Sequence, residues 1–534
     1  MPSTAVTLSR SENQALGIGQ YAIDFVSGRL GSGPSPAVIE RVKLFHTDAV
    51  LCGLSALALG TNAPTLLRNE ALEYPDEAGA TVFGSAVRVK AEKAIVANSS
   101  AVREWDSNGT NFGFNPALGH TAGEFGHNDF YPVVIAACQQ RGLDGATALR
   151  AMVCLDEIRG RLAEVFSLKT YKLDHVVHGA IGSAAVYGAL MGATAEQIES
   201  AIGMMVAHYI PWRAIRAGKQ LSDSKGASAA ISTEAAILSV KRSMKGFMGP
   251  RDIFRNPEAI FRFFEPTTSG AERWKESGDS PFDLVLSHSG DDFAVMGMHF
   301  KLGLYEHQSA GALQGIIDLV AANPGLLDDP SGGRIASISV VAYEPAFGII
   351  GNPMKKDPKT RQSADHSMAY IVATLLRKAL DYRAVHGSLP QGGGANDALW
   401  KALMLSPYDY QVADTAIFHP VARELMAKID FRHGGAAYDE KYPDGIPTSL
   451  VITDIEGKTY DSGFVMYPAG HARNTTANLA DILDHKFRLL GELSVPQGGD
   501  VDALVARFQN LGSLNAAGVA NLYDFDLGSR PGYE

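Results

Sequence analysis

A long succession of helical patterns dominates the first half of the sequence and restricts the possible folds most strongly. From about residue 35, VIERVKLFHTDAVLCGLSALAL follows the Ser35-Pro36 start signal and repeats apolar residues every three or four positions. The pattern continues in PVVIAACQQRG, DGATALRAMVCLDEIRGRLAEVF, HVVHGAIGSAAVYGALMGA, TAEQIESAIGMMVAHYI and GASAAISTEAAILSVKRSMKG. Many of these segments are rich in Ala and Gly and lack a charged face, so we expect them to be buried against one another. The sequence therefore predicts a large all-α domain over residues 1–285.

The pattern changes after the polar, turn-rich segment EPTTSGAERWKESGDSPFDL. RIASISVVAYEPA has the β-branched bias of a strand, and SLVITDIEGKTYDSGFVMYP predicts two strands around a Glu-Gly turn. ADHSMAYIVATLLRKALDYRAV and PVARELMAKI, between them, have helical patterns. We predict a smaller α+β domain over residues 286–485, whose last part can return to the helical domain, and a C-terminal tail over 486–534. The fold class is mainly α.

Composition excludes several classes of protein. The 534 residues carry a formal net charge of -11, which argues against nucleic acid as a partner because phosphate binding needs a basic face. The three cysteines, Cys52, Cys138 and Cys154, are widely spaced among apolar residues. We expect them to be small buried hydrophobic residues, neither a disulfide framework nor ligands of a metal cluster.

The chain shows no signal core near its start and no run of roughly 18 apolar residues, so we expect a cytoplasmic protein without a membrane span. It has no P-loop, no GxGxxG with a Rossmann pattern and no GxSxG elbow. Nucleotide, dinucleotide and serine-hydrolase functions are therefore disfavoured. Acid/base catalysis by side chains is the class of chemistry that these exclusions leave open.

Titratable side chains gather on one loop between two predicted helices. Residues 103–132, REWDSNGTNFGFNPALGHTAGEFGHNDFYP, contain four carboxylates and two histidines, His120 and His127. A loop of this kind is a candidate wall of a polar site.

Lys225 lies where a lysine is electrostatically unfavourable. Ser222 and Asp223 are capping residues, and the Ala-rich helix after them places Lys225 in its first turn. The helix dipole disfavours a cation there unless an anion lies beside it, and spare N–H groups with the ammonium would bind a carboxylate. The alternative is a solvated lysine on a surface helix.

Asp174 could cap another helix that begins with His175, Val176, Val177 and His178. The two histidines share a face, but a metal site would need a clear third ligand, so we expect no metal. A histidine on an otherwise apolar helix needs a partner or a ligand, because burying it unpaired is costly. A satisfied core histidine is the ordinary alternative.

His307 opens the helix after the linker, and Tyr370 lies in an apolar helix where a tyrosine is more often a core residue than a catalyst.

Six segments in this order resemble the MmgE/PrpD family, which includes 2-methylcitrate dehydratase, cis-aconitate decarboxylase and iminodisuccinate epimerase. Asp106, Thr110 and the Gly126-His127 pair resemble its D-x-x-x-T and G-H motifs. The other matching segments are LDHVVHGAIGSAA, SDSKGASAA, YEHQSAGA, ADHSMAYIVA and YPAGHARN. The similarity covers roughly residues 15 to 485, and DHVV is close to the methylcitrate dehydratase form.

The resemblance implies a large helical domain covered by a smaller α/β lid, with the site between them, in a homodimer that needs no cofactor. It implies seven site residues: Asp106, Thr110, His127, His175, Lys225, His307 and Tyr370. It also implies a carboxylate substrate and a place in propionate metabolism. This chain departs from the family in a longer stretch between Thr110 and His127, which brings in His120; we choose His127 because HNDFYPVVIAA leads directly into the next helix.

The expected reaction is the dehydration of a 2-hydroxy tricarboxylate, such as 2-methylcitrate or citrate, to an aconitate-type alkene. Such a hydro-lyase needs a base, an acid and cations that hold the substrate. Without cysteines for an iron–sulfur cluster, side chains must supply all three. We assign Lys225 and His307 to carboxylate binding, His175 with Tyr370 to proton transfer, and Asp106 with His127 to the hydroxyl. The alternatives are a decarboxylase or epimerase on a related substrate, and a non-catalytic helical scaffold, which no carboxylate would stabilise thermally.

Overall fold

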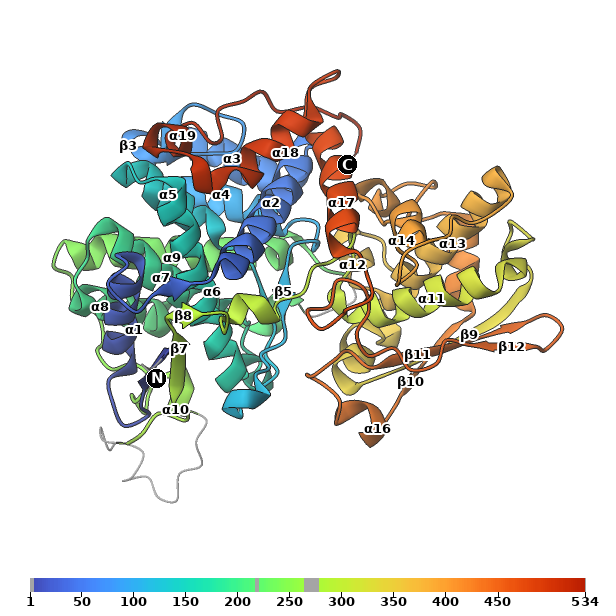
Figure 1. The fold of residues 1–534 in the computed structure, drawn as a ribbon, viewed down its shortest axis with the longest axis horizontal. Coiled ribbons are helices and arrows are strands. Elements are labelled where there is room, and N and C mark those ends of the chain that lie inside the picture. The colour runs from blue at the N-terminus through green and yellow to red at the C-terminus, as the bar shows by residue number, and fades with distance from the viewer. Residues whose placement is uncertain (1–3, 217–219, 264–277, 534) are drawn as a thin grey trace.

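The computed structural model describes residues 4–216, 220–263 and 278–533, and in these residues the chain is mainly α-helical, as predicted (Figure 1). Most of the linker segment EPTTSGAERWKESGDSPFDL lies outside the described residues. Figure 1 shows one large helical part, coloured blue to green, beside a smaller part, coloured yellow to orange, that contains a sheet.

Helices from the first half of the chain make up most of the large part: α1 (Gln14–Val26), α2 (Pro36–Ala58), α3 (Asn62–Leu72), α4 (Ala91–Arg103), α5 (Tyr131–Arg141), α6 (Gly145–Val165), α7 (Val176–Met191), α8 (Ala195–His208), α9 (Asp223–Met244) and α10 (Ile260–Phe263). α9 packs against α4, α7 and α8. Its buried side includes Gly226, Ala229 and Ala236, and such small residues let neighbouring helices approach closely.

Capping residues fix where the helices begin. α2 begins at Pro36, and the hydroxyl of Ser35 accepts a hydrogen bond from Val38 N at 3.4 Å, which confirms the predicted start. Lys225 is in the first turn of α9, as predicted. α7 begins at Val176, one residue later than predicted, and Asp174 accepts a hydrogen bond from Val176 N at 3.3 Å.

The smaller part contains a four-stranded sheet in the order β10-β9-β11-β12, formed by β10 (Ile429–His433), β9 (Ile335–Ala342), β11 (Thr448–Asp454) and β12 (Thr459–Asp461). These bounds confirm the predicted strands on either side of the Glu-Gly turn. β9 pairs in parallel with β10 and antiparallel with β11. The helices here are α11 (Ala310–Ala322), α12 (Arg361–Ala364), α13 (Met368–His386), α14 (Asp397–Leu403), α15 (Pro420–Ala427) and α16 (Ala436–Asp439).

The end of the chain returns to the large part. α17 (Leu479–Ser494) and α18 (Val501–Gln509) pack against α2, and α19 (Ala516–Ala520) packs against α5. Figure 1 shows the red α17 and α18 beside the blue α2. The expected boundary at residue 485 falls inside α17, whose buried Lys486 lies next to Asp48 of α2 at 2.6 Å.

The remaining strands are short pairs that tie distant segments of the large part together: β1 (Ala5–Leu8) with β7 (Leu284–Ser287), β2 (Gly33–Pro34) with β8 (Ser289–Gly290), β3 (Pro75–Thr81) with β4 (Arg88–Val89), and β5 (Thr110–Asn111) with β6 (Gly126–His127). In the described residues no single helix has the length and apolar character of a membrane span; α2 and α3 meet those limits only together, across a bend of 90°.

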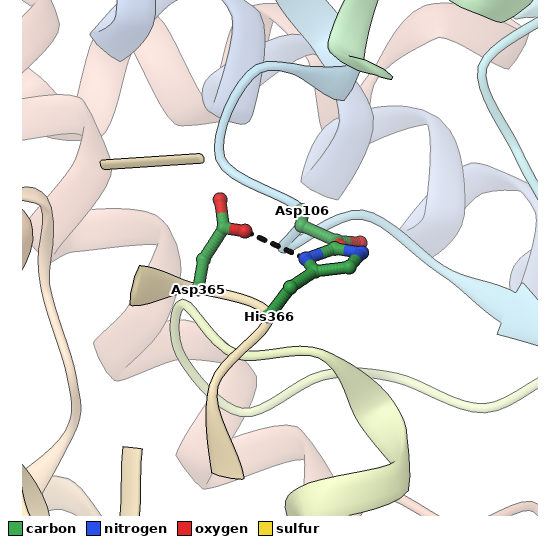
Figure 2. Close-up of side chains that lie close together, drawn as sticks. All are labelled: Asp106, Asp365 and His366. Atoms are coloured by element: carbon green, nitrogen blue, oxygen red, sulfur yellow. Dashed lines mark hydrogen bonds and ion pairs between the residues drawn. The ribbon is translucent and has the colours of Figure 1, made fainter. Parts of the chain in front are cut away.

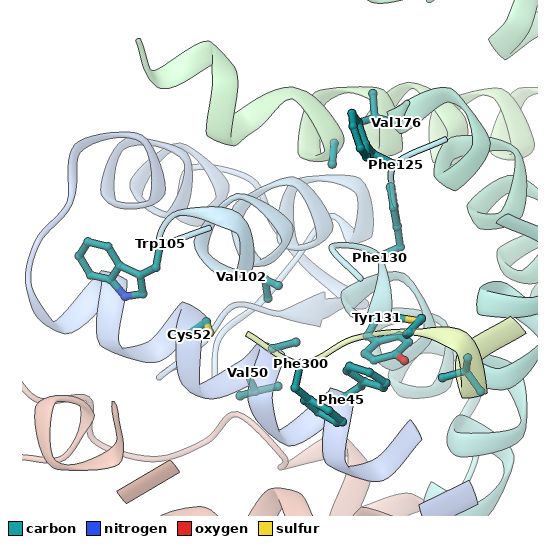
Figure 3. Close-up of a cluster of buried hydrophobic side chains, with 14 of the residues drawn as sticks. Phe45, Val50, Cys52, Val102, Trp105, Phe125, Phe130, Tyr131, Val176 and Phe300 are labelled. Atoms are coloured by element: carbon teal, nitrogen blue, oxygen red, sulfur yellow. The ribbon is translucent and has the colours of Figure 1, made fainter. Parts of the chain in front are cut away.

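An aromatic cluster fills the core between α2 and the segments beside the site (Figure 3). The rings of Phe45 and Phe300 stack with centroids 3.9 Å apart, and Trp105 donates a hydrogen bond to the Ser55 hydroxyl at 2.9 Å. Cys52 lies in this cluster, and all three cysteines are buried and free, as predicted. Burial of large rings supplies much of the favourable free energy of such a core.

Candidate active site

A small cavity lies where residues of both halves of the chain meet. Its volume is about 50 Å³, and thirteen residues line it: Arg103, Thr110, Phe112, Phe125, His127, His175, Arg213, Arg216, Glu306, Gln308, Ile349, Lys355 and His366. Three of the seven residues expected from the sequence, Thr110, His127 and His175, are on this wall.

A hairpin of two short strands sets Thr110 opposite His127. β5 pairs antiparallel with β6 so that these two residues are partners in register, and the Thr110 hydroxyl donates to Gly126 O at 2.8 Å. Thr110 also exchanges backbone hydrogen bonds with His299. A Cβ at position 126 would lie 2.4 Å from Asn111 Oδ1, so a larger residue there would have to displace that side chain. The hairpin therefore fixes the threonine and the histidine together on the cavity wall.

His127 and His175 form an imidazole pair whose ring centroids are 5.2 Å apart. Both nitrogens of His175, and Nδ1 of His127, are buried without a hydrogen-bond partner among the described residues. Burial, with Arg103 nearby, lowers the pKa of both rings well below the usual value, although Asp174 acts in the opposite direction on His175. Both imidazoles are therefore neutral at pH 7, with free ring nitrogens that can accept or pass a proton.

Asp174 orients the start of α7 from behind His175. Its carboxylate lies 3.5 Å from His175 Nδ1 and forms an ion pair with Arg216, whose Nη2 donates at 3.2 Å. His178, one turn further along, pairs with Phe166 O at 3.0 Å. One ring nitrogen of His178 is thus hydrogen-bonded in the core, whereas neither ring nitrogen of His175 is.

Asp106 lies directly behind the cavity wall and is fully buried among cations. Arg103 and Lys301 form close ion pairs with one carboxylate oxygen, and the other lies 3.5 Å from Lys225 Nζ and 3.2 Å from His366 Nε2. Burial opposes ionisation, but these cations outweigh it and hold the pKa of Asp106 well below its usual value. Asp106 has φ +51°, which turns the chain sharply after α4 and brings its carboxylate back beneath Arg103.

The anion that Lys225 requires is supplied by the protein itself. Lys225 Nζ donates to Asp365 Oδ1 at 2.9 Å, and the same oxygen lies 2.7 Å from His366 Nδ1 (Figure 2). Lys225 is 1% exposed, which excludes the solvated surface lysine. Its expected role in binding substrate directly is not supported by its position, because Asp365 and Asp106 occupy the ammonium and Lys225 does not line the cavity.

Asp106, Asp365 and His366 are the one group of metal-ligand side chains in the described residues with ligand atoms within 4.8 Å of one another (Figure 2). Their surroundings do not fit a metal ion, because Arg103, Lys225 and Lys301 already neutralise the two carboxylates. A divalent cation would have to displace these ammonium and guanidinium groups. The trio belongs to an ion-pair network.

The stretch between Thr110 and His127 contacts the smaller part. His120 lies outside the cavity lining, 3.2 Å from Glu164, whereas His127 is on the wall. Tyr442 donates a hydrogen bond to Gly123 O at 3.0 Å, and the Lys169 ammonium lies 4.1 Å from the centroid of the Phe125 ring. These contacts hold the longer loop against the turn between α16 and β11 that carries Tyr442.

Besides Asp106 and Lys225, two further expected residues, Tyr370 and His307, do not line the cavity. Tyr370 does not line it, and its hydroxyl donates to Asp409 O inside the smaller part, so the structure does not bring it to the imidazole pair. The His307 ring is buried against Phe112 and His299, with centroids 5.5 and 5.1 Å away, and neither nitrogen has a hydrogen-bond partner in the described part of the chain.

Six charged or titratable residues on the wall were not expected from the sequence: Arg103, Arg213, Arg216, Glu306, Lys355 and His366. His366 stands in ADHSMAYIVA and Glu306 precedes His307, so both lie in segments that the motif comparison had singled out. Arg103 is one helical turn before Asp106, a spacing typical of an ion pair. Nothing in the local pattern distinguishes Arg213 or Lys355.

A larger cavity, of about 310 Å³, lies near the end of α1. It is lined by glycines and apolar residues, and Arg150 is the charged side chain among them. It lacks the convergent acids, bases and cations of the smaller cavity, so the smaller cavity is the better candidate for an active site.

Comparisons with known proteins show which family this chain resembles. Residues 23–271 match the model of the MmgE/PrpD N-terminal domain. The 2-methylcitrate dehydratase of Escherichia coli strain K12 is 22% identical over 347 residues, which cover 64% of this chain and 62% of that protein. The 2-methylcitrate dehydratase of Escherichia coli O157:H7 gives the same figures. The match therefore spans less than two thirds of the length of these curated relatives.

Proposed function

Because the chain belongs to the MmgE/PrpD family, we propose that it is a hydro-lyase that removes water from a 2-hydroxy tricarboxylate, such as 2-methylcitrate or citrate, and forms an aconitate-type alkene. The observation that carries this proposal is the pair of neutral imidazoles, His127 and His175, which face a cavity with four cationic side chains on its wall. A polycarboxylate needs such cations, and abstraction of a weakly acidic C–H proton needs such a base.

His175 is the proposed base, because neither ring nitrogen has a hydrogen-bond partner among the described residues and because burial, with Arg216 and Arg103 nearby, lowers its pKa and keeps it neutral. It takes a proton from the carbon beside a carboxylate, and the C=C bond forms as the C–O bond breaks. His127 hydrogen-bonds the departing hydroxyl. The positive charge around the site stabilises the electron-rich transition state.

Glu306 is the proposed acid that protonates the hydroxyl as it leaves as water. Its side chain lines the cavity, and burial together with the negative charge of Asp106 raises its pKa to about 7. A carboxyl group with such a pKa carries a proton in a large fraction of molecules at neutral pH. Asp106 is fully ionised and has the different role of holding Arg103, Lys225 and Lys301 in place. The proton gained by His175 restores Glu306 after product leaves, so one water is released per turnover.

The cavity is narrow for this substrate. Its 50 Å³ accommodates roughly four water molecules, far less than a tricarboxylate. We expect binding to widen it by moving the two parts, or the side chains between them, apart. We propose further, on the family resemblance alone, that the enzyme acts without a cofactor as a homodimer in the cytoplasm.

The decisive experiment is a substrate panel. The protein is incubated with citrate, both 2-methylcitrate diastereomers, cis-aconitate and iminodisuccinate, while alkene absorbance and released CO2 are followed. Alkene formation without CO2 supports a dehydratase. Release of CO2, or racemisation without an alkene, would instead establish the decarboxylase or epimerase alternative, which would use the same base and cations.

Variants then test the assignments. His175→Gln and Glu306→Gln are expected to lower kcat by about 100-fold or more, because each removes a proton-transfer group. His120→Gln is the matched control, since His120 lies on the same loop system but off the cavity wall. Folded His175→Gln protein with unchanged turnover would remove His175 from the mechanism.

A further inference from the structure

Four cationic side chains line the cavity, and two of them are already neutralised. Arg103 forms an ion pair with Asp106, and Arg216 forms one with Asp174. Arg213 and Lys355 are different: neither has an ion pair or a hydrogen bond from its side chain among the described residues. A cavity wall with two unneutralised cations favours an anion.

Arg213 is held in place by its backbone and not by its guanidinium. It lies in the short 3-10 turn η3 (Arg213–Arg216), and its N–H donates to Lys172 O at 2.8 Å. Its Nη1 is buried without a hydrogen-bond partner. The two carboxylates that attract it are occupied, because Asp174 binds Arg216 and Glu124 accepts hydrogen bonds from backbone N–H groups at 2.8 and 2.7 Å.

Lys355 approaches from the smaller part of the molecule. It ends the short 3-10 turn η9 (Pro353–Lys355), is half-buried and lines the same cavity. Arg213 and Lys225 repel its positive charge, and Asp365 and Glu306 attract it without contacting it. Burial and this repulsion lower its pKa. An anion between Lys355 and Arg213 would relieve both effects.

We propose that Arg213 and Lys355, which line the same cavity, together bind one carboxylate of the substrate. This inference rests on the proposed function and adds the group that selects the substrate. Because one cation comes from each half of the chain, the bound carboxylate bridges the two parts. Substrates without a carboxylate at this position are therefore expected to bind poorly, and the pair acts on binding more than on the chemical step.

The test uses tricarballylate, a tricarboxylate that lacks the hydroxyl and cannot be dehydrated. Its Kd is measured by calorimetry for the full-length protein and for Arg213→Gln, Lys355→Gln and the double variant. Each single variant is expected to raise Kd about 10- to 100-fold, since a charge-assisted hydrogen bond is lost. The double variant should raise Kd by less than the product of the single effects, because both cations bind one carboxylate.

Controls separate this role from a structural one. Arg141→Gln and Lys245→Gln remove exposed cations away from the cavity and should leave Kd unchanged. The ligand-free Tm of Arg213→Gln and Lys355→Gln should equal or exceed that of the wild type, because each removes an unneutralised charge. Arg213→Lys should recover part of the affinity. An unchanged Kd in both single variants, or a fall in ligand-free Tm that accounts for the loss of binding, would overturn the proposal.

Failure of this proposal and failure of the proposed function give different results. If tricarballylate binding depends on Arg213 but the protein dehydrates none of the substrates, the carboxylate site is supported and the dehydratase function is contradicted. If the protein turns over 2-methylcitrate and Arg213→Gln leaves KM unchanged, the dehydratase function is supported and the carboxylate site is contradicted.

Discussion

At the scale of single residues, Asp106 is the shared partner of several buried cations. Its carboxylate is completely buried and is the shared partner of Arg103, Lys225 and Lys301. Removing one member of a buried ionic network leaves the others unpaired in a medium of low dielectric constant. We therefore predict that Asp106→Asn lowers the free energy of unfolding by about 3–5 kcal/mol, measured by urea denaturation. Asp381→Asn, which removes the exposed partner of Arg377, should change it by less than about 0.5 kcal/mol.

The contribution of Asp106 depends on pH in a definite direction. In the folded protein the pKa of Asp106 is lowered, so its ionised carboxylate stabilises the fold. This stabilisation is complete above about pH 4–5 and is lost as the pH falls through the lowered pKa. The difference in unfolding free energy between wild type and Asp106→Asn should therefore be constant near neutrality and shrink below about pH 4. A difference that grew on acidification would contradict the ionised state of Asp106.

Sequence patterns identified single residues only where a helix or a motif marked them. Lys225 was found because its place in a first helical turn is unfavourable without an anion, yet the pattern could not tell that Asp365, 140 positions later, is that anion. Arg213 and Lys355 carry no such local mark. Their importance comes from meeting at one cavity, which only the tertiary structure determines.

At the scale of elements, close packing at the start of α7 sets the position of His175 relative to His127. Gly179, one turn into α7, lies against the Phe130 ring, and a methyl group at position 179 would come within 1.9 Å of it. Phe130 follows β6 by three residues, so Gly179→Ala would push the two histidine-bearing segments apart. Overpacking of this kind costs about 1–3 kcal/mol.

We predict that Gly179→Ala lowers kcat at least about tenfold in addition to its effect on stability, because small displacements of catalytic groups are costly. Thermal unfolding and steady-state kinetics measure the two effects. Gly325→Ala is the control, since a methyl group there would meet only Asp328 at an ordinary 3.7 Å. Full activity in Gly179→Ala would show that the imidazole pair tolerates the shift.

The start of α2 was predictable because a capping residue acts locally, as Ser35 does. The β5–β6 hairpin was not, because each strand has only two residues and no alternation of apolar side chains. Its register comes from pairing across the loop and from the bridge between Thr110 and His299. The long stretch between Thr110 and His127 indicated a larger loop beside the site, but its length could not indicate the shape of that loop.

At the scale of the whole molecule, Lys486 connects the end of the chain to the site. Its ammonium lies 2.6 Å from Asp48 and donates to Ser107 O and Lys301 O at 2.7 and 2.8 Å. In an amphipathic helix such a lysine would ordinarily be solvated, so its place in the core was not predictable from the helical pattern. Here it joins α17, α2 and the segments that carry Asp106 and its partners.

We predict that Lys486→Met lowers the free energy of unfolding by about 3–5 kcal/mol, because it leaves Asp48 unpaired. The Asp48→Leu/Lys486→Met double variant should lose less than the sum of the single variants. Burial already raises the pKa of Asp48 despite Lys486, so without the lysine it should take up a proton more readily. The penalty of Lys486→Met should accordingly be smaller at pH 5 than at pH 7; equal penalties would argue against a charged Asp48.

The ion-pair network around Asp106 also determines when the protein can mature during its synthesis. A nascent chain that ends at residue 285 contains the helices α1 to α10, yet it has not made Lys301 or His366, two partners of Asp106. Lys486, the partner of Asp48, emerges later still. The helical part therefore leaves the ribosome with two buried carboxylates short of counter-charges, and it depends on contacts of high sequence separation that form slowly. We expect co-translational chaperones to hold this intermediate, and truncation before Lys486 to yield a chain that aggregates or is degraded.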